Sequence, residues 1–576
     1  MLEWRKWLNG SGKPSANPPP PAAAAAAWQA GNGAAAVPDV VSDFPRGLPD
    51  GDRHKPLATA VLPSEADTIA TLGPWEPGRF LIGRDSAGRY IGHGDDRHIL
   101  TVAGSRAGKG VSLIVPALLT WPHSAICIDP KGELATITAS RRGEGSKWAD
   151  KMPGKGEVYV LDPFKRVTGP AESYRSAFNP LADMKPETDA GLEMAGQIAD
   201  ALVIQQEGAA AHWTMSARTF LLGLVLYIAK VEPPASRNLV TLRHKLLQRA
   251  DDFELMLDHM IEQEGVIARA ATSLRAKPRD ERASVVSTCD TQTAWLEGEA
   301  MKSVLCGDDF RLEDLKDRRI TVYLCLPAMR LGTHGRWLRM MIGMALEALE
   351  RTGPIKETQH RVLFCLDEFA VLGHMQPIER AAGQIAGFGV KLWPVIQDLT
   401  QLQRDYQKAW ETFMGNAGLL TFFGNTDLTT LEHISKRLGE TEVIRTVNNL
   451  TESWQSTTGQ SAPGMLDSLA GLGTSSTSAG MNAGGNRSAT ENLQRAPLMN
   501  PEEIARHFSR EAGNILAFVP NKPPAGRPFA LHRCVYFSEE DDRLFGGLFD
   551  PAPGQVTAPR TSVAERHRRN GAPGSG

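Results

Sequence analysis

Apolar residues recur along the chain as short runs separated by helix-like stretches, beginning at about residue 56. Such runs lie at 98–103, 124–128 and 158–161. A glycine-rich turn and a helix-like segment, 111–119, separate the first two. Short buried strands that alternate with helices are typical of a parallel sheet covered by helices. The pattern therefore predicts an α/β fold.

The strand pattern stops at about residue 184 and returns near residue 309. Between these points apolar residues follow a helical period, and no convincing strand interrupts them. Strand-like runs resume at 320–326 and 362–366. This order predicts one mostly parallel sheet flanked by helices, built from residues 56–183 and 309–550. An all-α domain, residues 184–308, is expected as an insertion between the two parts.

Three further segments have compositions that disfavour a packed core. Residues 1–55 are rich in proline, alanine and glycine, and are predicted to form a disordered arm. Residues from about 446 to 492 are rich in serine, threonine, glycine and asparagine, which predicts a mobile loop. Residues 551–576 are predicted to be a disordered basic tail. For Trp4 and Trp7 two interpretations remain: docking onto a membrane or partner, or chance aromatics at a disordered end, which is the simpler one.

Composition narrows the class of protein. Hydrophobic residues make up 41% and charged residues 22% of the 576 positions, as in ordinary globular proteins. The formal net charge of -3 excludes a passive DNA-coating protein, so any nucleic-acid contact must be local. The six cysteines form no CxxC pair, which argues against a zinc site and a disulfide framework. The longest apolar run, 220–229, is about half of what a membrane-spanning helix needs, which predicts a cytosolic protein.

The strongest chemical signal is the segment AGSRAGKGVS, residues 103–112, between a predicted strand and a predicted helix. A phosphate chain needs a turn whose backbone N–H groups point inward. Gly104 and Gly108 permit that path, Lys109 supplies a charge for the outer phosphates, and the next helix adds its dipole. The sequence therefore predicts a P-loop for ATP. Its expected binding residues are Gly104, Ser105, Arg106, Ala107, Gly108, Lys109, Gly110 and Val111.

This loop departs from the GxxxxGK[ST] pattern at two positions. Ala103 stands in place of the first glycine, and Gly110 in place of the hydroxyl residue that normally binds Mg²⁺. Ser112 is a poor substitute, because two residues along a helix turn its side chain by about 200°. Coordination of Mg²⁺ is therefore expected to depend on water and on a carboxylate from elsewhere in the chain.

That carboxylate is predicted at Asp367 and Glu368, which end the apolar strand of the segment RVLFCLDEFAVLG. Ligands of an open α/β sheet bind at the carboxyl ends of its strands. We expect Asp367 to hold Mg²⁺ through water and Glu368 to polarise the attacking water. An acidic pair that merely faces solvent is the alternative, and the P-loop argues against it. The predicted insertion explains the long separation from Lys109.

Several motifs in this order resemble the conjugative DNA-transfer ATPases, or type IV secretion coupling proteins of the TraG/VirD type. The resemblance covers residues from about 90 to 545. The motifs are Arg106 with the ending Gly108-Lys109-Gly110, then Asp129-Pro130-Lys131-Gly132-Glu133, Phe178-Asn179-Pro180-Leu181, His212-Trp213, Leu366-Asp367-Glu368-Phe369-Ala370 with Leu372-Gly373, and Val395-Ile396-Gln397-Asp398 followed by Gln401-Leu402, Tyr406 and Asn416.

The resemblance implies a RecA-like P-loop NTPase that hydrolyses ATP with Mg²⁺. It assigns Asp129 to metal or phosphate support and Gln397 to sensing of the γ-phosphate, with an ordinary polar strand end as the alternative for Gln397. Relatives form hexameric rings, so an arginine from a neighbouring subunit is expected in the site. Arg380, Arg404 and Arg437 remain equal candidates for it.

The resemblance also implies a function and partners. The chain is expected to recruit DNA, single-stranded and attached to a relaxase, and to move it towards a type IV secretion channel. The inserted helical domain would recruit the cargo. Alternatives are a motor for effector proteins, or a cargo receptor that ATP switches. Most members begin with membrane-spanning helices whereas this sequence begins with the arm, so a cytoplasmic protein recruited peripherally to the inner membrane is expected.

Overall fold

The computed structural model describes residues 63–144, 156–204, 208, 211–459, 478–520 and 528–553. The predicted arm and nearly all of the predicted tail lie outside these residues. The described residues fall into two compact units, and residues 434–500 belong to the second.

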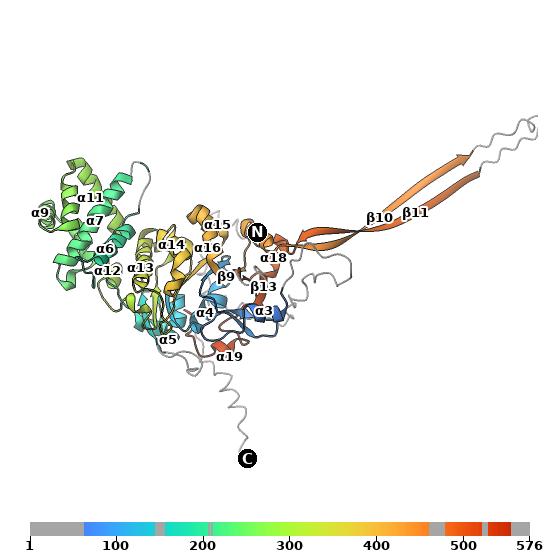
Figure 1. Ribbon diagram of the computed structural model, residues 1–576, viewed down its shortest axis with the longest axis horizontal. Helices are drawn as coiled ribbons and strands as arrows, with labels where there is room; N and C mark the ends of the chain where they lie inside the picture. The colour runs from blue at the N-terminus through green and yellow to red at the C-terminus, as the bar shows by residue number, and fades with distance from the viewer. Residues whose placement is uncertain are drawn as a thin grey trace, which may run out of the picture. The chain divides into compact units, whose positions relative to one another are not determined.

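One sheet of eleven strands organises the first unit (Figure 1). Seven neighbouring strands run parallel, and four further strands continue the sheet antiparallel beyond the first of them. The parallel strands, in spatial order, are β9 (Ala417–Phe423), β3 (His98–Ala103), β8 (Val390–Ile396), β7 (Val362–Leu366), β4 (Ser124–Ile128), β6 (Ile320–Leu324) and β5 (Glu157–Leu161). The antiparallel strands, counted outward from β9, are β12 (Asn514–Phe518), β13 (Pro528–His532), β1 (Phe80–Arg84) and β2 (Tyr90–His93). The predicted mostly parallel sheet is confirmed.

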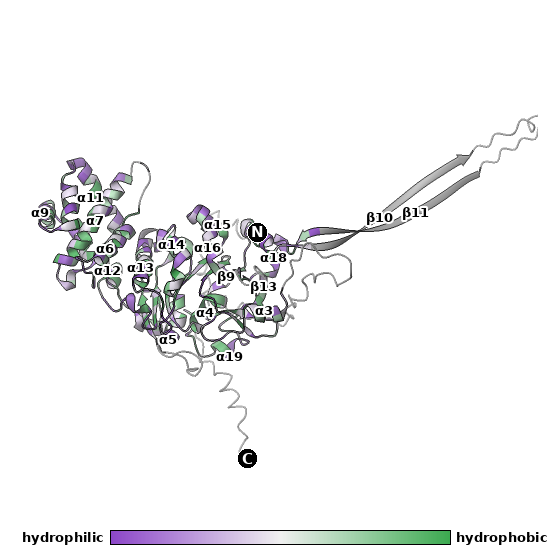
Figure 2. Ribbon diagram, in the orientation of Figure 1, coloured by the Kyte–Doolittle hydropathy of each residue, from purple (hydrophilic) through white to green (hydrophobic). Residues whose placement is uncertain are grey.

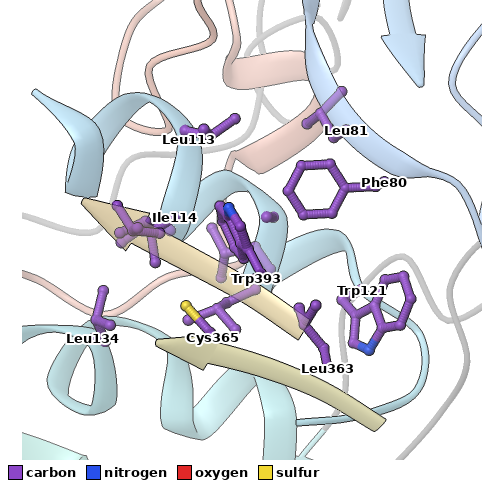
Figure 3. Packing of buried hydrophobic residues seen from close by; sticks show 14 of the residues in the cluster. Phe80, Leu81, Leu113, Ile114, Trp121, Leu134, Leu363, Cys365 and Trp393 are labelled. Carbon is purple, nitrogen blue, oxygen red and sulfur yellow. The ribbon is translucent and has the colours of Figure 1, made fainter. Parts of the chain in front are cut away.

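The parallel strands are buried on both faces, which explains their continuous apolar runs. Trp393 of β8 is fully buried and meets Phe80 edge to face at 4.8 Å (Figure 3). Its indole N–H donates to the hydroxyl of Thr101 on β3 at 2.9 Å, so the one polar atom of this large side chain is satisfied. These contacts tie β3 to β8 and fix the relative height of their carboxyl ends.

Helices flank this sheet, and the long helix predicted around 337–349 is confirmed as α13. Lys316 is fully buried, and its ammonium donates to the carbonyl of Leu349 in the last turn of α13 at 2.7 Å and to that of Gly353 just after the helix at 2.6 Å. These helices are α3 (Glu65–Thr71), α4 (Val115–Thr120), α5 (Glu133–Glu144), α13 (Leu331–Arg351), α14 (Gln376–Gln384), α15 (Leu399–Tyr406), α16 (Trp410–Asn416), α17 (Leu428–Leu438), α18 (Pro501–His507) and α19 (Asp542–Phe545).

Between β5 and β6 the described residues form helices and no strand, as the periodicity predicts. Figure 2 shows apolar and polar stretches along these helices. They are α6 (Asp189–Leu202), α7 (Ala211–Val231), α8 (Leu239–Leu246), α9 (Ala250–Ile261), α10 (Gly265–Arg275), α11 (Arg279–Thr293) and α12 (Glu299–Leu305).

Helix α7 is the centre of this bundle and corrects one expectation. It packs against α6, α10 and α11, and a Cβ at Gly223 would lie 2.3 Å from that of Ala270, so α7 and α10 approach closely. By length and composition α7 is apolar enough to cross a membrane, whereas the apolar runs of the sequence predicted no such segment. The helix is longer than the apolar run 220–229 because it includes less apolar residues at both ends. Of its most apolar stretch, 61% is buried in the fold.

The second unit contains a long antiparallel hairpin where a mobile loop was predicted. Strands β10 (Glu440–Gly459) and β11 (Ser478–Pro497) pair in continuous register from Glu440 opposite Pro497 to Gly459 opposite Ser478. Threonine, valine and isoleucine recur through β10, and β-branched residues favour extended backbone. Because this segment is also rich in serine and glycine, its composition predicted a loop and not strands. The middle of the predicted loop, 460–477, lies outside the described residues.

Candidate active site

The P-loop follows β3 and is fixed by close backbone packing. Gly104 donates its N–H to the carbonyl of Phe423 at 3.3 Å, and a Cβ at Gly104 would lie 1.9 Å from the carbonyl oxygen of Gly424. Only glycine fits there. Arg106 and Gly108 adopt positive φ angles of 59° and 91°, which turn the backbone as a phosphate cradle requires.

The side chains of this loop differ in exposure. Ser105, Arg106 and Val111 are exposed, Ala107 is buried, and Gly104, Gly108, Lys109 and Gly110 are half-buried. The predicted helix after the loop begins with a π-helical turn, Gly110–Ile114, and continues as α4. Such turns are rare and concentrate at functional sites.

Strand order brings the two predicted halves of the site together. β8 lies between β3, which leads into the P-loop, and β7, which ends before Asp367. The ammonium of Lys109 lies 2.9 Å from Glu368 Oε1 and 3.3 Å from Asp367 Oδ1. The three side chains are 15%, 32% and 17% exposed, respectively, so the ion pairs are sheltered yet open to solvent. Residues separated by the whole helical insertion thus meet at one edge of the sheet.

The pKa values of the two carboxyl groups shift in opposite directions, although both groups contact the same ammonium. Burial would lower the pKa of Lys109, but Asp367 and Glu368 outweigh it and the pKa is raised. Burial raises the pKa of Asp367 despite the nearby ammonium. Burial also acts to raise the pKa of Glu368, but the charge and hydrogen bond of Lys109 outweigh it and the pKa is lowered. Glu368 is therefore held in the ionised form that accepts a proton.

Gln397 lies at the end of β8, between the P-loop and the carboxylates. Its amide Nε2 donates to Glu368 Oε2 at 3.0 Å. Its own backbone is fixed on both sides: the N–H donates to Gln401 Oε1 at 3.0 Å, and the carbonyl accepts from Asn425 Nδ2 at 3.3 Å. The predicted Gln397 thus joins Lys109 and Glu368 in one network.

Glu368 is itself in an unusual backbone conformation. Its φ and ψ are 57° and 46°, the left-handed region that a non-glycine residue rarely adopts. The conformation costs on the order of 1–3 kcal/mol and recurs at functional sites. It directs the two consecutive carboxylates towards the same ammonium.

Asp129 ends β4, which pairs directly with β7 so that Ile128 lies opposite Leu366. Its carboxylate is buried and accepts the N–H of Ala135 at 2.8 Å. Burial, the largest influence, and the charge of Asp367 together raise the pKa of Asp129 to about 7, although backbone hydrogen bonds oppose the shift. A divalent cation near both carboxylates would offset this repulsion.

The residues fit a Mg²⁺ site that also uses phosphate and water oxygens. Two adjacent strand-end carboxyl groups, at Asp129 and Asp367, have pKa values raised by burial, which a second cation would reverse. Among the described residues no set of three protein ligands forms a metal site by itself. The hydroxyl of Ser112 donates to the carbonyl of Gly108 at 2.8 Å, as its poor direction towards a metal predicts. Apart from the chain neighbours and helix backbone of Gly110, no atom of the described residues lies within 4 Å of a Cβ built there, so the place where the usual hydroxyl side chain would begin is open.

The structure also reveals a residue that the motifs did not identify. Arg533, just after β13, is buried and donates to the P-loop carbonyl of Ala107 at 2.6 Å. It also donates to the carbonyl of Arg510 at 2.5 Å, and its guanidinium stacks over Phe423 at 5.0 Å. Burial lowers the pKa of Arg533 to about 10, so it remains charged at neutral pH. An isolated arginine far along the chain carries no sequence signal for this role.

Arg533→Met is expected to raise the KM for ATP about tenfold, because Ala107 loses a charge-assisted hydrogen bond and the loop loses its support. Arg543→Met is the matched control, since Arg543 also stacks on an aromatic ring, at Tyr90, and donates to a backbone carbonyl, at Gly88. Steady-state kinetics with thermal unfolding of both variants test this. An equal change in the two variants would contradict the role.

The three candidate arginines for a shared site lie on three different helices. Arg380 is exposed on α14. Arg404 on α15 pairs with its neighbour Asp405 at 2.7 Å. Arg437 is half-buried near the end of α17. Which of them, if any, reaches a neighbouring subunit remains a prediction.

Solved structures share this architecture. The bacterial conjugative coupling protein TrwBdeltaN70, in complex with sulphate, matches with a TM-score of 0.56 at 15% identity, over 85% of this chain and 96% of that chain. TrwB in complex with ADP and Mg²⁺ matches with a TM-score of 0.53 at 15% identity, over 86% and 97%. These likenesses confirm the predicted P-loop NTPase fold.

Sequence comparison identifies the family. The conjugal transfer protein TraG of Escherichia coli is 26% identical over 504 residues, 82% of this chain and 70% of TraG. VirD4 of Agrobacterium fabrum is 26% identical over 499 residues, 84% of this chain and 65% of VirD4. A family model described as type IV secretory system conjugative DNA transfer matches residues 57–463. Because this match spans well over half of the sequence, the chain belongs to the type IV secretory system conjugative DNA transfer family.

Proposed function

We propose that this chain is an ATP-hydrolysing coupling protein that moves DNA towards a type IV secretion channel. The observation that carries the proposal is the contact of Lys109 with Asp367 and Glu368, with Gln397 bound to the same glutamate. A phosphate loop, a metal-binding aspartate and a basic glutamate are the groups that ATP hydrolysis requires. The family and its DNA-transfer relatives indicate what the hydrolysis drives.

Each residue has a defined part in this proposal. The P-loop N–H groups and Lys109 bind the β- and γ-phosphates of ATP. Asp367, with Asp129 beside it, would hold Mg²⁺, which would supply positive charge for the phosphate oxygens. Glu368 orients the attacking water and accepts its proton. Gln397, which touches Glu368, responds when the γ-phosphate arrives or leaves.

The proposal includes assembly and location. A homohexamer shares sites between subunits, and an arginine from the neighbour completes each one. The cargo is single-stranded DNA attached to a relaxase. The protein is cytoplasmic and reaches the inner membrane peripherally, through channel components or the segment before residue 56.

The rate of ATP hydrolysis per subunit, measured against protein concentration with and without single-stranded DNA, tests this function. We expect a steep rise with concentration, because a shared site exists only in the assembled ring, and stimulation by DNA. A rate that DNA leaves unchanged but an effector protein stimulates would redirect the proposal to protein cargo. Absence of hydrolysis under all conditions would contradict the enzyme itself.

A further inference from the structure

A second group of side chains lies at the carboxyl edge of the sheet, beyond the nucleotide site. β4, β6 and β5 are neighbours there, with Ile128 opposite Leu324 and Leu324 opposite Leu161. The loops after these strands therefore start side by side. Their outward-facing residues, which we call the strand-end cluster, are Lys131, Phe164, Lys165, Arg166, Met329 and Arg330.

Direct contacts make this cluster continuous. The guanidinium of Arg330 lies over the ring of Phe164 at 5.3 Å, and Phe164 meets His334 edge to face at 5.2 Å. A Cβ at Gly132 would come within 2.9 Å of the backbone carbon of Arg166, so the loop of Lys131 presses against the loop of Arg166. The three loops form one surface.

The strand-end cluster is positively charged, and backbone hydrogen bonds to Asp162 fix one of its loops. Lys165, Arg166 and Arg330 are exposed, and none pairs with a carboxylate of the described residues; Lys131 has only a 3.9 Å pair with Glu133. The buried carboxylate of Asp162 accepts the backbone N–H groups of Arg166 and Val167, each at 2.8 Å.

Backbone strain at Lys165 supports a role beyond solvation. Its φ is 53°, although a lysine gains nothing locally from the left-handed region. The hydrogen bonds to Asp162 hold this turn, so Lys165 and Arg166 both project outward from a rigid loop. Left-handed backbone of this kind at a non-glycine residue recurs at functional sites.

Met329 is the most exposed large apolar side chain among the described residues. It is 94% exposed, whereas the next, Leu428, is 63% exposed. Met329 lies at the tip of the short turn between β6 and α13, directly before Arg330. Apolar side chains that project among cations insert between stacked bases in nucleic-acid-binding proteins.

We infer that the strand-end cluster binds single-stranded nucleic acid, with Lys165, Arg166 and Arg330 on phosphates and Met329 between bases. The cations match a polyanion, and the apolar tip matches exposed base faces. The net charge of the chain does not oppose this, because the contact is local. The inference deepens the proposed function by placing the cargo, but binding can be measured without ATP.

The cluster also touches the nucleotide site through one loop. Asp129 begins the β4–α5 connection and anchors it to Ala135, and Lys131 lies two residues later. One loop therefore carries both a carboxylate of the nucleotide site and a cation of the strand-end cluster.

Fluorescence anisotropy of a labelled oligodeoxythymidine of about 30 nucleotides, with the full chain and no ATP, tests the inference. Lys165→Ala/Arg166→Ala should weaken binding about tenfold and reduce the slope of log K against log salt by about 1.4, since two phosphate contacts are lost. The matched control is Arg279→Ala/Lys356→Ala, which removes two exposed cations from other surfaces. Equal losses in the two double variants would overturn the inference.

Met329→Ala should weaken binding about fivefold without changing the salt slope, and Leu428→Ala should not weaken it. Vesicles of phosphatidylglycerol are the competing probe. If the double variant loses vesicle binding and keeps oligonucleotide binding, the cluster serves a membrane and the inference is wrong. Basal ATP hydrolysis should be unchanged in all four variants. If the wild-type chain and both double variants bind the oligonucleotide equally, only this inference is overturned. A wild-type chain that binds no oligonucleotide contradicts the proposed DNA cargo as well, and a chain that binds it but hydrolyses no ATP contradicts only the ATPase.

Discussion

Lys109→Ala is expected to reduce ATP hydrolysis at least about 100-fold and to abolish DNA transfer. The ammonium is the P-loop charge that is expected to meet the outer phosphates, and its loss also leaves Asp367 and Glu368 facing each other without this cation. Affinity for ATP should fall as well, because two neighbouring carboxylates would repel a polyphosphate. Hydrolysis by the purified variant and transfer in cells carrying only the variant measure the two effects.

Lys356→Ala is the appropriate control, because Lys356 is exposed before β7 and its side chain takes no part in the site. Thermal unfolding should show that Lys109→Ala is folded, since Lys109 packs at a partly open edge and not in the core. Normal DNA transfer by folded Lys109→Ala would remove the motor function.

Glu368→Gln is expected to reduce hydrolysis about 100-fold or more while ATP binding is retained or strengthened. The amide keeps the size of the side chain but accepts no proton from water. It also removes one of the two anions that hold Lys109, which leaves the ammonium freer to bind phosphate. Single-turnover hydrolysis and equilibrium binding of ATP separate the two effects.

The same variant distinguishes a motor from a receptor that ATP switches. A motor with Glu368→Gln should hold ATP and cargo but deliver no DNA. A switched receptor would deliver its cargo normally, because binding alone sets its state. Lys109→Ala does not make this distinction, since it impairs binding and hydrolysis together.

Much of the sheet could be predicted because its parallel strands are short and wholly apolar. β3, β4 and β7 have the predicted bounds, and the acidic pair follows β7 directly. Each signal is local: an apolar run, a glycine turn, a charged residue at a strand end. The sequence also indicates that Lys109 and Asp367 meet, because both follow strands of one parallel sheet.

Features that depend on long-range packing could not be predicted in the same way. Arg533 supports the P-loop from more than four hundred residues away, through carbonyl groups that any sequence offers. The left-handed backbone of Glu368 is invisible in a motif that names only side chains. The pairing of β10 with β11 depends on cross-strand partners, and strand propensity varies with such context.

The contact between Lys109 and the two carboxylates has a consequence for the end of each catalytic cycle. A phosphate in the P-loop competes with Asp367 and Glu368 for one ammonium, so binding is an exchange of anions. As phosphate departs, the carboxylates take its place and make its return less favourable. Turnover of many enzymes is limited by release of product. Carboxylates that compete in this way lower the affinity of the site for the products of hydrolysis and so speed their release.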